Sequence, residues 1–93
     1  MATVIHYSDK NRFVAEEEAR EAGYLEYERE ADGAVFVANH VVTSEEFRGR
    51  GIAGEVTAAA FEHARRHHIK VRPVCPYVVQ WVEKHPEVRD LLA

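Results

Sequence analysis

The segment that decides the fold is Phe47-Arg48-Gly49-Arg50-Gly51-Ile52-Ala53-Gly54, which contains three glycines and two arginines. It lies between an apolar run at 34–42 and the start of an amphipathic pattern at 52–68. Glycine lets backbone N–H groups approach a ligand closely, and the first turn of a helix presents free N–H groups with partial positive charge. The two arginines add forked donors that suit phosphate oxygens. The segment therefore predicts an anion site, most naturally for a diphosphate.

Two common phosphate motifs do not account for this segment. It lacks the Lys-Ser/Thr end of a P-loop, which would bind the phosphates and the magnesium ion of a nucleotide. The spacing of Gly49, Gly51 and Gly54 formally fits the dinucleotide fingerprint, but an antiparallel meander precedes it. The acidic residue of that fingerprint, expected about 20 residues later, is also missing, because the chain there reads Ile69-Lys70-Val71-Arg72.

Upstream of the segment, short alternating or apolar runs predict strands, and polar clusters predict turns. The expected strands are 3–7, a second from Arg12, 24–28, and a central strand at 34–42. Turns are expected at 8–11 and at Ala31-Asp32-Gly33, and the acidic run Glu16–Glu18 is expected in a solvated loop. Residues 3–42 therefore predict an antiparallel meander.

Downstream of the segment, the pattern changes to helices around one strand. A helix is predicted over 52–68, a strand over 69–75, a helix from Pro76 to about His85, and a short helix from Pro86 to near Leu92. A strand, a helix and a strand in this order imply a right-handed crossover with parallel pairing. The fold class is therefore α/β (α+β), with a mixed, mostly antiparallel sheet of about five strands and C-terminal helices.

Composition limits the remaining possibilities. The chain of 93 residues predicts one domain over 1–93, and its single cysteine excludes an intramolecular disulfide. Residues 1–46 carry a net charge of −7 and residues 47–93 a net charge of +3. This argues against general nucleic-acid binding, while the basic half could hold a smaller anion. With no apolar run near the roughly 20 residues of a membrane span and no signal peptide, a cytoplasmic protein without membrane contact is expected.

Two histidines have a spacing that is used for metals. His63 and His67 stand four residues apart, but no glutamate lies between them as in the zinc-protease pattern. They are therefore expected at an exposed polar helix end, and no metal site is predicted.

The run Arg48-Gly49-Arg50-Gly51-Ile52-Ala53 resembles the Q/R-x-x-G-x-G/A signature of the GNAT N-acetyltransferase superfamily. The run Val74-Cys75-Pro76-Tyr77, with His85-Pro86-Glu87 and Asp90-Leu91-Leu92, resembles a narrower group of small single-domain members. The two motifs together extend the resemblance over nearly the whole chain. It implies a GNAT-like fold in which two splayed strands hold the pantetheine of acetyl-CoA.

The resemblance also assigns residues to coenzyme A. The implied pyrophosphate cradle is Arg48, Gly49, Arg50, Gly51, Ile52, Ala53 and Gly54. The implied strand end that hydrogen-bonds the pantetheine and the thioester is Val41, Val42 and Thr43. Related small proteins commonly carry a glutamate where Val42 stands, so the identity of the general base is open.

Three side chains are candidates for the chemistry of acetyl transfer. Cys75 directly precedes a predicted helix, whose dipole favours a thiolate, and it could donate a proton, accept the acetyl group or only line the pocket. His40, near the end of the central strand, could accept a proton from an amine. Tyr77 could contact the cofactor and donate a proton to the CoA sulfur, or it could simply pack its ring.

The sequence thus predicts an acetyl-CoA-dependent N-acetyltransferase that acts on a small amine or a peptide amine. The alternative is a CoA- or acyl-CoA-binding module with little catalysis, because the chain is short for a GNAT domain and Val42 replaces the usual acid. A third possibility, a small interaction protein, predicts no CoA affinity.

Overall fold

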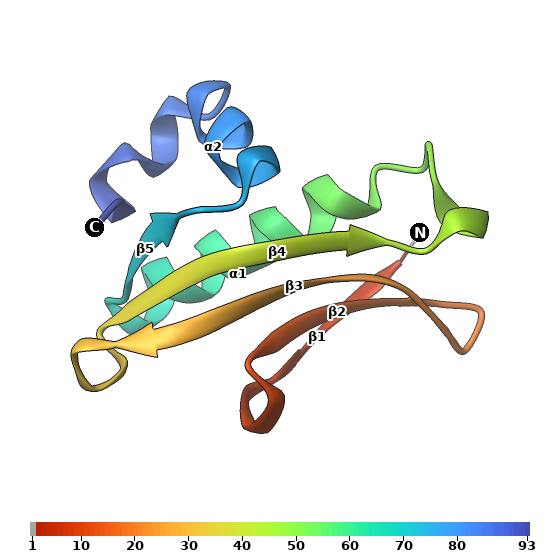
Figure 1. The fold of residues 1–93 in the computed structure, drawn as a ribbon, viewed down its shortest axis with the longest axis horizontal. Coiled ribbons are helices and arrows are strands. Elements are labelled where there is room, and N and C mark those ends of the chain that lie inside the picture. The colour runs from red at the N-terminus through yellow and green to blue at the C-terminus, as the bar shows by residue number, and fades with distance from the viewer. Residues whose placement is uncertain (1) are drawn as a thin grey trace.

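The computed structural model describes residues 2–93, which form five strands in a single sheet. The strands are β1 (Thr3–Tyr7), β2 (Arg12–Glu17), β3 (Arg20–Glu30), β4 (Val35–Thr43) and β5 (Lys70–Pro73). Neighbours in the sheet follow the chain order, with antiparallel pairing from β1 to β4 and parallel pairing of β4 with β5 (Figure 1). The predicted meander and parallel crossover are both confirmed.

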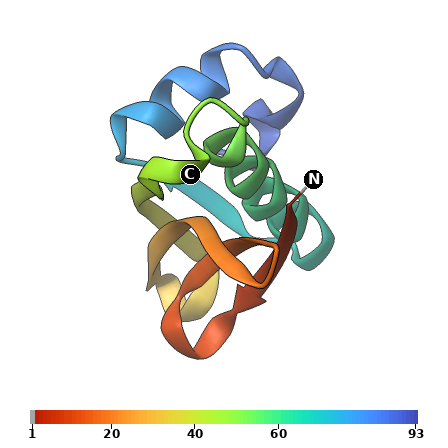
Figure 2. The same cartoon turned by 90° about the vertical axis from the view of Figure 1, so that its right-hand side faces the viewer.

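Two α-helices and four short 3-10 segments complete the fold. The helices are α1 (Ile52–His67) and α2 (Pro76–Glu83), and the 3-10 segments are η1 (Ser8–Lys10), η2 (Ala31–Gly33), η3 (Glu45–Phe47) and η4 (Pro86–Leu91). In Figure 2, α1 lies between the strands of the meander and α2. Among residues 2–93, no helix has both the length and the apolar character that crossing a bilayer requires.

The core forms between α1 and one face of the sheet. The helix buries a stripe that follows its own periodicity, because Ile52, Val56, Ala60 and Ala64 recur at four-residue steps. This stripe packs with buried strand residues that include Phe13, Ala15, Leu25, Tyr27, Phe36 and Ala38. The opposite face of the sheet carries polar pairs such as Arg12 with Glu26. Hydrophobic burial therefore holds α1, and with it the preceding loop, against the middle of the sheet.

The structure corrects three predicted boundaries. The last strand ends at Pro73 rather than residue 75, since the N–H groups of Val74 and Cys75 both turn to the carbonyl of Ala38. The third strand begins at Arg20 rather than residue 24, because Glu18 and Ala19 alone, both with left-handed φ, make the preceding turn. The helix that starts at Pro76 ends at Glu83.

Candidate active site

The parallel pair β4 and β5 separates before β4 ends, which creates a fork. Their ladder stops at Ala38 and Pro73, where the N–H groups of Val74 and Cys75 donate to the carbonyl of Ala38 at 3.1 and 2.9 Å. The chain then turns into α2, whereas β4 continues to Thr43 (Figure 1). On the β5 side, the last part of β4 therefore has backbone groups without a strand partner.

A β-bulge lies at the point of separation. Across the β3–β4 ladder Glu26 faces His40 and Tyr27 faces Ala38, which leaves Asn39 as the extra residue. A bulge bends its strand and increases the local twist, and both effects turn the end of β4 away from β5. The geometric cause of the fork is therefore this extra residue in β4.

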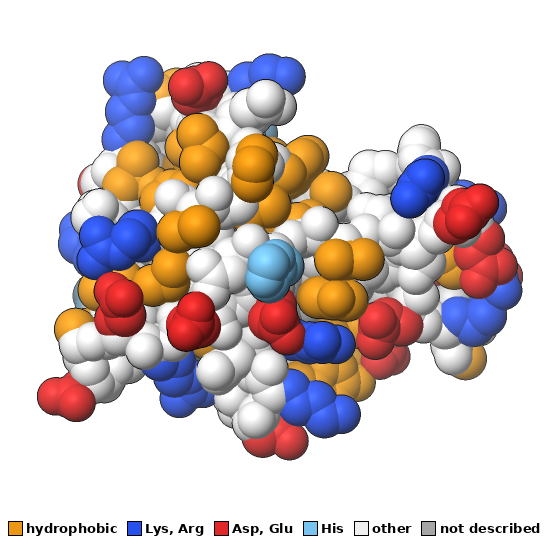
Figure 3. Space-filling model, in the orientation of Figure 1, with side chains coloured by type: hydrophobic (Ala, Val, Ile, Leu, Met, Phe, Trp, Pro, Cys, Tyr) orange, Lys and Arg blue, Asp and Glu red, His pale blue; other side chains and the backbone are white. Residues whose placement is uncertain are grey.

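Beyond the bulge, the side chains of β4 have different environments. Val41 packs against the core, whereas His40 is exposed and Val42 is 42% exposed. Large apolar side chains that are exposed among residues 2–93 are Val42, Val74, Tyr77 and Val79. Figure 3 shows hydrophobic side chains gathered over β5 and α2 and over the end of β4. The fork thus has apolar margins on both sides.

Cys75 and Tyr77 come from the first residues around α2. Cys75 is a free thiol, 9% exposed, at the N-cap of α2, and its N–H binds Ala38 two residues before His40. The hydroxyl of Tyr77 would be 3.4 Å from a Cβ built on Gly54 in the first turn of α1. Burial raises the pKa of Tyr77, which keeps its phenol protonated. The fold therefore places the backbone of Cys75 beside Ala38, two residues before His40, whose side chain faces Glu26 on the polar face of the sheet. Tyr77 connects α2 with α1.

The glycine-rich loop leads into an uncapped helix. Gly49 and Gly51 have φ of 81° and 77°, the left-handed region that glycine adopts without strain. Gly51 is the N-cap of α1, no side chain caps the helix, and the carbonyl of Gly51 accepts the N–H of Glu55. A methyl group at either glycine would meet no atom within 4 Å, so the space beside the loop is open. These uncapped N–H groups fit an anion.

Two residues that the sequence analysis did not select hold this loop in place. Phe47 is 1% exposed and anchors the loop in the core. Gly23 lies where β3, β4 and α1 meet, and a Cβ there would come within 2.6 Å of the Val42 carbonyl and 2.7 Å of the Ile52 side chain. The absence of a side chain at Gly23 therefore lets the first turn of α1 approach the end of β4.

The two arginines of the loop differ in their surroundings. Among residues 2–93, no side chain forms a hydrogen bond or ion pair with Arg48, which is exposed. The Arg50 guanidinium binds the Glu17 carboxylate at 2.7 Å, and the Glu17 side chain is only 14% exposed. The expectation that Glu16–Glu18 is a solvated loop is therefore wrong for Glu17, because the end of β2 lies against the loop before α1.

With the fork and the loop described, comparison with known proteins identifies the family. The pattern of the GCN5-related N-acetyl-transferase family matches residues 12–91. The chain belongs to this family. The predicted GNAT resemblance is thereby confirmed, and the protein is an acyltransferase of the N-acetyltransferase class.

A solved structure supports the GNAT fold. The NMR solution structure of a GCN5-like protein from Staphylococcus aureus is 23% identical to this chain and superposes with a TM-score of 0.72. The match covers 98% of this chain and 87% of that one. Likeness of this degree establishes a shared overall fold.

Away from the fork, the structure corrects the expectation for His63. Its ring is not at an exposed helix end but packs among aromatic rings, with centroids 4.4 Å from His6, 5.5 Å from Phe13 and 5.9 Å from Phe36. Burial first, and then neighbouring positive groups of which His6 is the strongest, together lower the pKa of His63 to about 4. His63 thus packs as a neutral ring in this GNAT domain. No group of three or more His, Cys, Asp or Glu within residues 2–93 is arranged to hold a metal ion.

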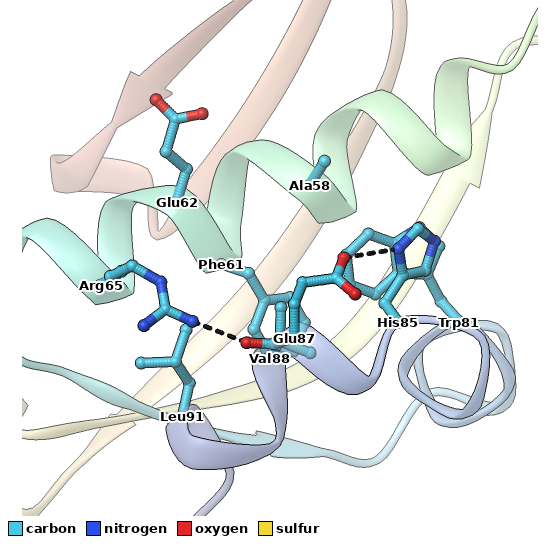
Figure 4. A pocket seen from close by; sticks show the side chains of 9 residues that line it. All are labelled: Ala58, Phe61, Glu62, Arg65, Trp81, His85, Glu87, Val88 and Leu91. Carbon is cyan, nitrogen blue, oxygen red and sulfur yellow. Dashed lines mark hydrogen bonds and ion pairs between the residues drawn. The ribbon is translucent and has the colours of Figure 1, made fainter.

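A second hollow of about 340 Å³ lies on the outer side of α1, against α2 and η4 (Figure 4). Its lining consists of Ala58, Phe61, Glu62, Arg65, Trp81, His85, Glu87, Val88 and Leu91. Trp81 is stacked between Phe61 and His85, with centroid distances of 5.3 and 3.8 Å. The polar side chains pair locally, as His85 does with Glu87 at 2.9 Å. None of the candidate site residues lines this hollow, which is a packing groove between the helices of the GNAT domain.

Proposed function

We propose that this protein transfers the acetyl group of acetyl-CoA to a small amine or a peptide amine. The observation that carries the proposal is the fork beside the uncapped N-terminus of α1. An unpaired strand edge can hydrogen-bond an extended ligand that contains amide groups, as pantetheine does. Free N–H groups at a helix start suit a diphosphate. The end of β4 and the start of α1 would thus offer the two kinds of contact that coenzyme A needs, strand amides for the pantetheine and helix N–H groups for the diphosphate.

Different residues would bind different parts of coenzyme A. The backbone N–H groups of the loop and first helical turn would hold the diphosphate, namely those of Gly49, Arg50, Gly51, Ile52, Ala53 and Gly54. The N–H of Arg48 already donates to the carbonyl of Glu45, so this residue would contribute its side chain instead. The guanidinium of Arg48 would add a direct charged contact. The end of β4, at Val41, Val42 and Thr43, would bind the pantetheine and orient the thioester. Tyr77 would border the same channel from α2.

The chemistry requires a neutral amine and a protonated leaving group. The amine nitrogen forms a bond to the acetyl carbon while the bond from that carbon to sulfur breaks. The proton lost by the nitrogen would pass to the ring of His40, and the sulfur would receive a proton from Cys75 or Tyr77. Burial raises the pKa of Tyr77, so its phenol keeps the proton that it would donate. Cys75, at the N-cap of α2, is the alternative donor.

A thiolate at Cys75 would favour a covalent route. In that route the acetyl carbon forms a bond to the Cys75 sulfur as its bond to the CoA sulfur breaks, and the amine then displaces Cys75. Intact mass after incubation with acetyl-CoA separates the two routes, because only the covalent route adds an acetyl group to the protein that Cys75→Ala lacks. If Cys75→Ala retains full turnover, Cys75 only lines the pocket.

Binding and turnover test the proposal separately. Calorimetric titration with acetyl-CoA should show binding, and Arg48→Ala should weaken it roughly fivefold, because one exposed charged contact contributes about 1 kcal/mol or less. Arg66→Ala is the matched control, since Arg66 is an exposed arginine at the other end of α1. Release of CoA thiol with a panel of amines should then fall strongly in His40→Ala. A protein that shows neither heat nor a thermal shift with acetyl-CoA refutes the proposal.

One observation favours a second function, a CoA- or acyl-CoA-binding module with little catalysis. The exposed position on β4 where an acid could serve as base is occupied by Val42, and the only titratable side chain beyond the bulge in β4 is His40. Binding of acetyl-CoA without thiol release above background for any amine would establish this alternative.

A further inference from the structure

The turn between β2 and β3 touches the glycine-rich loop through two ion pairs. Glu17 binds Arg50 at 2.7 Å, and Arg20 binds Glu46 at 2.8 Å. Both guanidinium groups lie beside the ring of Phe47, at 5.1 Å for Arg20 and 5.2 Å for Arg50. These contacts join segments about thirty residues apart in sequence, so the turn between β2 and β3 restrains the loop before α1.

The two ion pairs are not equivalent. Glu46 is 58% exposed and Arg20 is 52% exposed, and a pair of this kind contributes little. Arg50 is as exposed as Arg20, at 52%, but the Glu17 side chain is only 14% exposed, so the carboxylate end of this pair is better shielded from water. Arg50 also stands between Gly49 and Gly51, both of which have left-handed φ. The Glu17 contact is therefore made between two glycines, the residues with the greatest conformational freedom in the unfolded chain.

This arrangement separates the tasks of the two loop arginines. The guanidinium of Arg50 is engaged by Glu17 and lies against Phe47, whereas no described side chain pairs with Arg48. A side-chain anchor between two glycines reduces the conformational freedom that the loop would lose when it binds a ligand. We propose that Glu17 is a positioning residue for the diphosphate loop, acting through Arg50, while Arg48 makes the direct charged contact.

The inference rests on the proposed function, because it assumes that the loop binds the diphosphate of CoA. The test measures the Kd of CoA by calorimetry for the intact protein and for Glu17→Gln, Arg50→Ala and their combination. Each single variant should weaken CoA binding on the order of tenfold, by adding the cost of ordering the loop. The double variant should bind no more weakly than the weaker single variant, because both changes remove the same contact. Glu46→Gln is the matched control and should stay within about twofold, as an exposed pair does.

Two further measurements distinguish positioning from a general loss of structure. The Kd of pantetheine, which lacks the diphosphate, should be unchanged in Glu17→Gln when measured by NMR titration. In the ligand-free protein, the backbone amides of Arg50 and Gly51 should exchange faster in Glu17→Gln than in Glu46→Gln.

Several results would overturn the inference. Tighter CoA binding by Glu17→Gln would mean that Glu17 competes with the diphosphate for Arg50. Unchanged CoA binding, or equal losses for CoA and pantetheine, would remove the positioning role. If the unaltered protein does not bind CoA, the proposed function fails instead, and the amide exchange of the ligand-free loop alone decides whether Glu17 orders it.

Discussion

Replacing Gly23 by alanine should destabilise the fold where β3, β4 and the start of α1 meet. The added Cβ would lie 2.6 Å from the carbonyl oxygen of Val42, 2.7 Å from the Ile52 side chain and 3.2 Å from the Thr43 backbone, all below the 3.4 Å of ordinary contact. Two of these three neighbours are backbone, which cannot rotate away as the end of a side chain can. Strand β4 or helix α1 must therefore move.

The magnitude follows from two opposing effects. Overpacking a well-packed site costs about 1–3 kcal/mol, and the backbone contacts at Gly23 place this change near the upper end. Alanine also restricts the unfolded chain more than glycine does, and this offsets about 0.5–1 kcal/mol of the overpacking cost. The net loss should be about 2 kcal/mol, which lowers the Tm of a domain of this size by roughly 10 °C.

Urea denaturation followed by circular dichroism measures this loss. Gly54→Ala is the control, because its Cβ would lie 3.4 Å from the Tyr77 hydroxyl, and alanine in a helix is about 0.5–1 kcal/mol better than glycine. We expect a lower unfolding midpoint for Gly23→Ala and an equal or higher midpoint for Gly54→Ala. If Gly23→Ala unfolds at the same or a higher urea concentration than the parent, the close approach at Gly23 does not constrain the fold.

Three further predictions follow from the packing and the charges. Because burial lowers the pKa of His63 to about 4 and that of His6 below its usual 6.5, the unfolded chain binds more protons between these values. Stability should therefore fall as pH decreases through this window, and His63→Gln should flatten the slope of unfolding free energy measured between pH 7 and pH 4.5. Phe47→Ala should cost about 3–4 kcal/mol in urea denaturation, because Phe47 is 1% exposed; a loss below about 1 kcal/mol would contradict its anchoring role. Arg65→Ala should leave the Tm nearly unchanged despite the ion pair of Arg65 with Asp90 at 2.9 Å, since both side chains are at least half exposed, and a clear fall in Tm would show that this pair is stronger than its exposure suggests.

The sequence predicted those features that depend on neighbours along the chain. Alternation and turn residues such as Asp32-Gly33 predicted the meander, and Pro76 predicted the start of α2. The apolar spacing from Ile52 predicted α1, and its place between two strands predicted the parallel crossover. The glycines before Ile52 marked the uncapped helix start, since backbone freedom is a local property.

The details of the fork could not be predicted in the same way. The bulge at Asn39 depends on the register of β4 against β3, and register is set by how whole strands pair. Gly23 directly precedes the strand expected at 24–28, but its role depends on a helix that begins almost thirty residues later. His63 was expected at an exposed helix end, but strands β1 and β2 place His6 and Phe13 against it.

By itself, then, the sequence determined the order of the elements, the parallel crossover and the glycine-rich loop that marks the GNAT family, because each of these follows from local propensity and spacing. Only the tertiary structure decided which loop arginine is paired. Arg48 and Arg50 have the same chemistry and stand two residues apart, and only the folding of β2 against the loop brings Glu17 to one of them. Glu17 and Arg50 are 33 residues apart in the sequence. Their contact depends on how β2 packs against the loop, which local sequence patterns do not predict.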